Sequence, residues 1–247
     1  MADISSLHVT TLGSGQTQII WAHGWGQDGG AFAPMAQSFA GFCTSYLIDF
    51  PGFGKTPFQG ETWGTRDYAD YVARWLQTLP PGKKIWVGHS FGGRVGLQIA
   101  AHYPDLISGL ILIGTAGIPR KRSALSRLNS WTRVRTFKTL KLFVPEGPKR
   151  DRLRARFGSA DYRSAGLLRP SFVRVVNENL SPEAATITLP TLLICGAKDD
   201  QAPIDISTRL HELIKGSALH ILPDFDHYTI LSNGRHQVAS LIKGFIE

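Results

Sequence analysis

A serine lies inside a glycine-flanked motif in the first half of the chain. The motif Gly-His-Ser-Phe-Gly occupies residues 88–92, after an apolar run at 85–87 and before a helical pattern. A strand, a tight turn and a helix in this order hold the serine hydroxyl above the edge of a sheet, where the helix dipole favours developing negative charge. The turn strains the serine backbone and needs neighbours without side chains two residues away. Ser90 is therefore the candidate nucleophile.

A serine hydroxyl becomes a good nucleophile only when a base removes its proton, and the base needs an acid to orient it. Of the eight histidines, His227 lies in a polar loop after the last predicted strand and before the last predicted helix, so it is the candidate base. Two adjacent carboxylates, Asp199 and Asp200, follow another strand and a turn. Asp199 is the favoured acid and Asp200 the alternative.

Acyl transfer also needs hydrogen-bond donors for the oxyanion. The backbone N–H of Phe91, directly after the nucleophile, is one candidate. The second is the N–H of Trp25, in a turn that follows the apolar run at 19–22. Gly24 and Gly26 flank Trp25 and allow the backbone to turn inward.

Short apolar runs alternate with helix-length patterns along most of the chain, which is typical of parallel strands joined by crossover helices. The predicted strands are 18–22, 44–49, 84–88, 110–114, 191–195 and 218–222. The predicted helices are 67–79, 91–102, 204–215 and 237–246, with Asp67 as an N-cap. Strands this apolar are covered on both faces. The fold class is therefore α/β, with a mostly parallel central sheet and helices on both of its faces.

The alternation stops after Thr115, and no clean strand is predicted between residues 118 and 181. Apolar residues recur there every three positions, so they drift around a helix instead of holding one face. These residues are Leu125, Leu128, Trp131, Val134 and Phe137. We expect several short helices forming a cap, inserted at 118–181 into a core made of 1–117 and 182–247.

The net charge of +8 is concentrated in this predicted cap. Residues 118–181 hold 16 Lys or Arg against four Asp or Glu and carry +12, whereas the remainder holds 11 against 15 and carries −4. A basic segment of this kind either attracts anionic partners or is simply a solvated surface, and the sequence leaves both readings open.

Composition excludes several other classes of protein. With 247 residues, 43% hydrophobic and 19% charged, the chain is globular. Its two cysteines, Cys43 and Cys195, lie in apolar runs and are expected to be buried thiols, since two cysteines make neither a disulfide framework nor a four-ligand zinc site. No signal peptide and no membrane span are predicted, so a cytoplasmic protein is the expectation. We expect no cofactor and no metal.

Taken in order, the motifs at 23–26, 49–54, 88–93, 196–203 and 226–227 resemble those of the α/β-hydrolase superfamily. The resemblance covers the chain except the middle segment, where such enzymes carry a helical cap. It implies a serine hydrolase whose triad, in chain order, is Ser90, Asp199 and His227. Asp226 stands where the family often has glycine, and this extra carboxylate is expected to affect the basicity of His227. The serine nucleophile argues against the dehalogenases and epoxide hydrolases of the superfamily, which use aspartate.

Within the serine branch, the chain is similar to carboxylesterases acting on pimeloyl-carrier-protein methyl ester, which use basic cap residues to dock an acidic carrier protein. The resemblance implies that an acidic carrier protein or an anionic acyl substrate contacts the cap. The candidate substrate-binding residues are Trp25, His89, Arg133, Arg135, Arg152 and Arg156, with Arg150 and Arg154 beside them.

The favoured function is therefore hydrolysis of carboxylic esters through an acyl-enzyme intermediate. A carbon–carbon bond hydrolase or an aminopeptidase on the same triad is the alternative. A third reading is a non-catalytic binder of nucleic acid or an anionic membrane. No nucleic-acid-binding motif accompanies the basic segment, so no nucleic-acid partner is expected.

Overall fold

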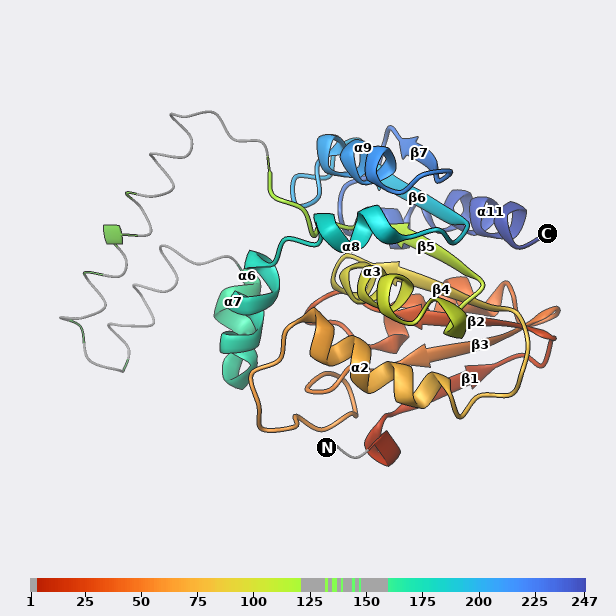
Figure 1. The fold of residues 1–247 in the computed structure, drawn as a ribbon, viewed down its shortest axis with the longest axis horizontal. Helices are drawn as coiled ribbons and strands as arrows, with labels where there is room; N and C mark the ends of the chain where they lie inside the picture. The colour runs from red at the N-terminus through yellow and green to blue at the C-terminus, as the bar shows by residue number, and fades with distance from the viewer. Residues whose placement is uncertain are drawn as a thin grey trace.

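The computed structural model describes residues 4–120 and 160–247, together with residues 132, 135, 136, 139, 144 and 147. These residues form one seven-stranded sheet with helices on both faces, as the sequence predicts. In Figure 1, α2, α3 and α8 cover the near face of the sheet and α11 lies behind it.

The sheet has the strand order β1-β3-β2-β4-β5-β6-β7. Its strands are β1 Val9–Leu12, β2 Thr17–Ala22, β3 Cys43–Ile48, β4 Lys84–His89, β5 Gly109–Ile113, β6 Thr191–Gly196 and β7 Ala218–Leu222. β1 pairs with β3 in antiparallel fashion, and every other pairing is parallel. The predicted fold class, a mostly parallel α/β sheet, is confirmed.

The helices described on the faces of the sheet are α1 Ala33–Gln37, α2 Thr65–Leu76, α3 Phe91–His102, α8 Ser181–Thr186, α9 Ile204–Leu213, α10 Thr229–Ser232 and α11 Arg235–Ile246. Short 3₁₀ turns are η1 Ile4–Ser6, η2 Gly29–Phe32, η3 Pro104–Leu106 and η4 Gly166–Leu168. Two further helices, α6 Ala160–Ser164 and α7 Arg169–Asn177, belong to the predicted cap.

Two apolar layers hold the sheet between its helices. Along β2, Ile20 faces the layer formed with α2, α3, α8 and α9, whereas its neighbours Ile19 and Trp21 face the layer formed with α1 and α11. Both alternations of the strand are therefore buried, which explains its continuous apolar sequence. Cys43 and Cys195 are buried free thiols, as expected.

The sequence predictions differ from the structure mainly at the two edge strands and at the start of α2. β7 was expected to be covered on both faces, but its residues are exposed or half-buried, because it lies at the edge of the sheet. β1 is an antiparallel edge strand whose residues are exposed or only half-buried, so its polar sequence carries no apolar run that would predict it. Asp67 was expected to be the N-cap of its helix, but the N-cap is Gly64. The carboxylate of Asp67 accepts a hydrogen bond from the Gly64 N–H at 2.7 Å, so it stabilises the helix start from inside the first turn.

The described part of the predicted cap lies beyond the carboxyl ends of the parallel strands, where Figure 1 shows α6 and α7. Leu168, Phe172 and Val175 turn a buried face toward the core. The five apolar residues with three-residue spacing, Leu125, Leu128, Trp131, Val134 and Phe137, lie outside the described residues. Among the described helices, none is long and apolar enough to cross a membrane.

Candidate active site

Ser90 lies at the sharp turn between β4 and α3, with φ 50° and ψ −105°. It is the only non-glycine residue with positive φ in the described part of the chain. The turn also requires the flanking glycines: a Cβ on Gly88 would meet the Gly92 carbonyl, and one on Gly92 would meet the Ala22 carbonyl. This local strain projects the hydroxyl from the carboxyl end of the sheet.

His227 and Asp199 form a hydrogen-bonded line with Ser90. The His227 Nε2 lies 2.9 Å from the Ser90 Oγ, and its Nδ1 lies 2.7 Å from the Asp199 Oδ2. The second carboxylate oxygen, Oδ1, accepts the backbone N–H groups of Gln201 and Ala202 at 2.8 and 2.7 Å. Since a carboxylate accepts at Nδ1, the ring proton resides there and the lone pair of Nε2 faces the serine.

The hydrogen bonds to Asp199 also set its charge. Burial by itself raises the pKa of this carboxyl, but the bonds from His227, Ala202 and Gln201 outweigh burial and hold the pKa below its usual value. Asp199 is therefore ionised at neutral pH. The neighbouring Asp200 is exposed, and its backbone carbonyl accepts a hydrogen bond from Arg120. Of the two adjacent carboxylates, the structure brings Asp199 to His227.

Asp226, which precedes His227, stabilises the loop and is not part of the hydrogen-bonded line of Ser90, His227 and Asp199. Its Oδ1 accepts the N–H groups of Tyr228 and Thr229, at 2.9 and 2.8 Å, and its own N–H donates to the Thr229 hydroxyl. The hydrogen bonds from Thr229 and Tyr228 lower the pKa of the Asp226 carboxyl. Asp226 thus fixes the start of α10 directly after His227.

The turn after β2 is held by a buried histidine. His23 donates from Nδ1 to the Gly24 carbonyl at 2.7 Å and accepts the Phe50 N–H at Nε2. Burial lowers its pKa to about 4, so the ring is neutral and can make both bonds. The turn leads to Trp25, whose N–H, like that of Phe91, makes no hydrogen bond to another described residue. Both residues line the pocket above Ser90.

His89 is not among the residues that line this pocket. Its side chain is 1% exposed, and its Nε2 donates to the backbone carbonyl of His227 at 2.9 Å. Burial lowers its pKa to about 3, so the ring is neutral. The structure places His89 beneath the loop of His227, whereas the sequence analysis expected it to contact substrate.

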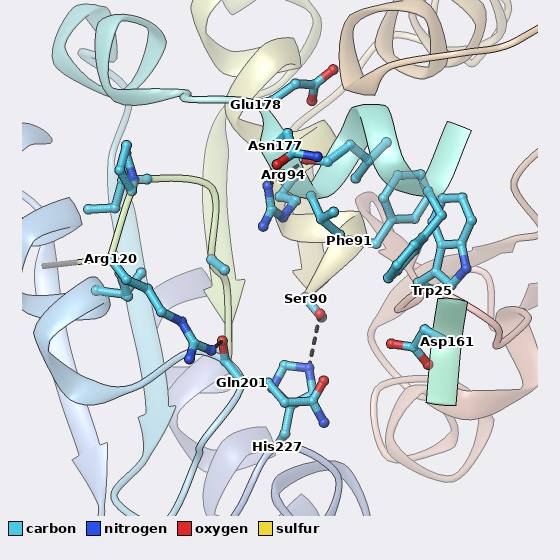
Figure 2. Close-up of a pocket in the computed structure, with 17 residues that line it drawn as sticks. Trp25, Ser90, Phe91, Arg94, Arg120, Asp161, Asn177, Glu178, Gln201 and His227 are labelled. Carbon is cyan, nitrogen blue, oxygen red and sulfur yellow. Dashed lines mark hydrogen bonds between the residues drawn. The ribbon is translucent and has the colours of Figure 1, made fainter. Parts of the chain in front are cut away.

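The pocket has a volume of about 710 Å³ and opens directly over the serine and histidine (Figure 2). One wall is aromatic: the Trp25 ring centroid lies 5.2 Å from those of Phe91 and Phe172, and 4.9 Å from that of Phe53, which does not itself line the pocket. Because Phe172 belongs to α7, this wall joins the core to the predicted cap. Such a surface suits the hydrocarbon part of a substrate.

Four charged side chains line the same pocket and were not singled out from the sequence as site residues. They are Arg94, Arg120, Asp161 and Glu178. Arg94 follows Ser90 by four positions and lies in the first turn of α3, the helix that begins directly after the nucleophile. That spacing is the signal that would have identified Arg94. The other three come from segments whose position depends on the tertiary fold.

Most of the cap arginines that the sequence predicts to bind substrate lie outside the residues that the structure describes. Arg133, Arg152 and Arg156 lie outside the described residues, as do Arg150 and Arg154. Arg135 is exposed and is not among the described residues that line the pocket. Within the described residues, no group of three His, Cys, Asp or Glu side chains is placed to hold a metal ion.

Comparisons with known proteins agree with this fold. The family model described as alpha/beta hydrolase fold matches residues 18–138. A pimeloyl-[acyl-carrier protein] methyl ester esterase of Chromobacterium violaceum is 30% identical over 254 residues, which cover 96% of each chain. The protein of the same name from Edwardsiella ictaluri is 26% identical over 96% of each chain.

Among solved structures, an esterase from Exiguobacterium antarcticum superposes with a TM-score of 0.76 at 22% identity, covering 98% of this chain and 96% of that one. An enol-lactonase from Burkholderia xenovorans superposes with a TM-score of 0.73 at 20% identity, covering 97% and 96%. These two likenesses bear on the fold alone. The relative that is 30% identical over nearly its whole length leads to one conclusion: the chain belongs to the α/β-hydrolase family and is an esterase of that family.

Proposed function

We propose that this esterase cleaves carboxylic esters through an acyl-enzyme intermediate on Ser90, with His227 as the base and Asp199 as the acid that orients it. One observation carries the proposal: a continuous hydrogen-bonded line joins the Asp199 carboxylate, the His227 ring and the Ser90 hydroxyl. The line ends in a pocket that is open to a substrate.

In the first half of the reaction, the Nε2 of His227 takes the proton of the serine hydroxyl while Oγ attacks the ester carbonyl carbon. The carbonyl oxygen becomes an oxyanion, which the N–H groups of Trp25 and Phe91 stabilise. His227 then gives its proton to the departing alcohol oxygen, and the carbon–oxygen bond of the ester breaks. The acyl group remains on Ser90.

In the second half, a water molecule takes the place of the alcohol. His227 removes its proton, the resulting oxygen attacks the acyl carbon, and the bond to Ser90 breaks. The acid leaves as a carboxylate, and Ser90 recovers its proton from His227. Throughout, the ionised Asp199 keeps the ring proton on Nδ1 and offsets the positive charge that His227 gains.

For the substrate, we propose an acyl ester presented by an acidic carrier protein. Two relatives that match nearly the whole chain are named for such a substrate. The +12 charge of residues 118–181 fits an acidic partner, which it would steer by long-range attraction. Arg133, Arg135, Arg152 and Arg156 are the proposed contacts. The cap proposed at 118–181, between core segments 1–117 and 182–247, includes α6 and α7 at the mouth of the pocket.

A substrate panel tests the reaction class. The protein and its Ser90→Ala variant are assayed with esters, amides and ring-cleavage diketones under identical conditions. We expect hydrolysis of the esters only, lost in Ser90→Ala. Faster turnover of the amides or diketones by the wild-type protein would instead support an aminopeptidase or a carbon–carbon bond hydrolase on the same residues.

A further inference from the structure

A second functional group of α3 points into the pocket beside the nucleophile. The backbone N–H of Arg94 donates to the Ser90 carbonyl at 3.1 Å, so the two residues are one helical turn apart. Arg94 therefore lies in the first turn of α3, directly after the turn that carries Ser90. Figure 2 shows the Arg94 guanidinium beside Ser90, within the pocket that both residues line.

Arg94 uses little of its hydrogen-bonding capacity within the described residues. A guanidinium has five N–H donors, and one Nη1–H of Arg94 donates to the Val175 carbonyl at 2.9 Å. Among the described residues, no carboxylate forms an ion pair with Arg94. By contrast, Arg174 on the outside of α7 pairs with Asp67 at 3.0 Å.

The acid whose charge acts on Arg94, Glu178, already makes hydrogen bonds to another residue. Glu178 lines the pocket, but its carboxylate accepts the Thr65 N–H at 3.0 Å and the Thr65 hydroxyl at 2.6 Å. Burial lowers the pKa of Arg94 to about 10, while the charge of Glu178 acts in the opposite direction. Arg94 therefore carries a full positive charge at neutral pH, in a pocket whose lining also includes the apolar side chains of Phe172 and Val175.

A second charged side chain makes the two sides of the pocket electrostatically different. Asp161 also lines the pocket, and in Figure 2 it lies on the opposite side of Ser90 from Arg94. Burial raises the pKa of Asp161, and the charge of His227 acts against that rise. A negative group on the substrate is therefore attracted on the Arg94 side, and the Asp161 side offers it no positive charge. The hydrocarbon between this group and the ester would lie along the aromatic wall.

We propose that Arg94 is a specificity-determining residue that binds a carboxylate at the far end of the acyl chain, so that monoesters of dicarboxylic acids are preferred substrates. This inference rests on the proposed ester hydrolysis at Ser90. It assigns the same pocket a substrate class distinct from a carrier-bound ester: an acyl chain joined to a carrier protein at its far end has no free carboxylate there, so only free monoesters of dicarboxylic acids would use Arg94 in this way.

The test compares three methyl esters of equal chain length: the monomethyl ester of a dicarboxylic acid, its dimethyl ester and the methyl ester of the matching monocarboxylic acid. We expect the wild-type kcat/KM to be highest for the monomethyl ester. Arg94→Gln should lower that value by about 10- to 100-fold, the usual range for a lost charge-assisted hydrogen bond, and leave the two neutral esters nearly unchanged.

Two control variants separate recognition from structure. Arg94→Lys keeps the positive charge and should retain part of the preference. Arg174→Gln removes another arginine that ties α7 to the core, through Asp67 and the Thr62 carbonyl, but Arg174 does not line the pocket. It should leave the preference intact. An equal loss on all three esters in Arg94→Gln would assign Arg94 a purely structural role and overturn the proposal, as would a wild-type protein without the preference.

Binding to an inactive variant distinguishes this proposal from the proposed function. Calorimetric titration of Ser90→Ala with the dicarboxylate and with the monocarboxylate requires no turnover. Tighter binding of the dicarboxylate, lost when Arg94→Gln is added, supports the subsite even if none of the three esters is hydrolysed. Equal binding of the two acids overturns the subsite even if ester hydrolysis at Ser90 is established.

Discussion

Replacing Asp199 by asparagine should abolish most activity through the ring proton of His227. The Oδ1 of Asp199 accepts two backbone N–H groups, and its Oδ2 accepts the His227 Nδ1–H. In the Asp199→Asn variant the amide oxygen must stay with the two N–H donors, because turning the amide would lose both bonds and cost about 1 to 3 kcal/mol for each donor left buried. The amide NH₂ therefore faces Nδ1, and the ring proton moves to Nε2.

A protonated Nε2 cannot accept the proton of Ser90. The expected loss in kcat is about 10⁴-fold, or roughly 5.4 kcal/mol at 1.36 kcal/mol for each factor of ten. The assay is steady-state hydrolysis of a p-nitrophenyl ester, with circular dichroism to confirm that the variant is folded. Asp200→Asn is the matched control, since Asp200 is adjacent and exposed, and it should be almost fully active. Retention of a tenth of wild-type kcat in Asp199→Asn, or a larger loss in Asp200→Asn, would refute this reasoning.

Three further predictions concern stability and the cap. His23 and His89 are buried and neutral, with pKa values lowered to about 4 and about 3, so the unfolded chain takes up protons below pH 6.5 that the folded chain does not. The free energy of unfolding should therefore fall between pH 6.5 and 4, by up to roughly 1.4 kcal/mol per pH unit for each histidine. Urea unfolding at several pH values measures this slope. The slope should be shallower in His89→Gln, and an unchanged slope in that variant would contradict the prediction. Gly92→Ala places a Cβ against a backbone carbonyl, and urea unfolding should show a loss of about 1 to 3 kcal/mol or no folded protein. Replacing Arg152 and Arg156 by Glu should lower kcat/KM for a carrier-bound ester and leave kcat/KM for a small neutral ester unchanged. The difference between the two esters should shrink at high ionic strength, because salt screens exposed charges. Equal effects on both esters would mean that the cap covers the pocket without binding a carrier.

The elements that the sequence predicted best are apolar runs bounded by clear turn signals. α3 spans residues 91–102 and β7 spans residues 218–222, both as predicted, because a glycine turn or a polar loop bounds each apolar run. β1 was missed, since an exposed edge strand needs no apolar pattern. The three residues proposed as a triad were also chosen from local sequence, and the structure brings them into hydrogen-bonding distance.

Other features of the pocket depend on contacts between distant segments. Nothing local to Asp161 or Glu178 indicates that these side chains reach a pocket formed by α3 and the turn after β2. Likewise, His89 stands next to the proposed nucleophile in sequence, but alternation along β4 turns it to the interior. The packing of α6 and α7 over the sheet edge is what brings Asp161 and Glu178 to the pocket above Ser90.

Trapping the acyl group on the enzyme tests the central claim most directly. Wild-type protein is treated with a fluorophosphonate, or mixed with a p-nitrophenyl ester and quenched in acid, and the modified peptide is identified by mass spectrometry. The account predicts a single adduct on Ser90, absent from Ser90→Ala, which should also lose nearly all ester hydrolysis while remaining folded. An adduct on another residue, or a Ser90→Ala variant that keeps a tenth or more of wild-type turnover, would contradict it.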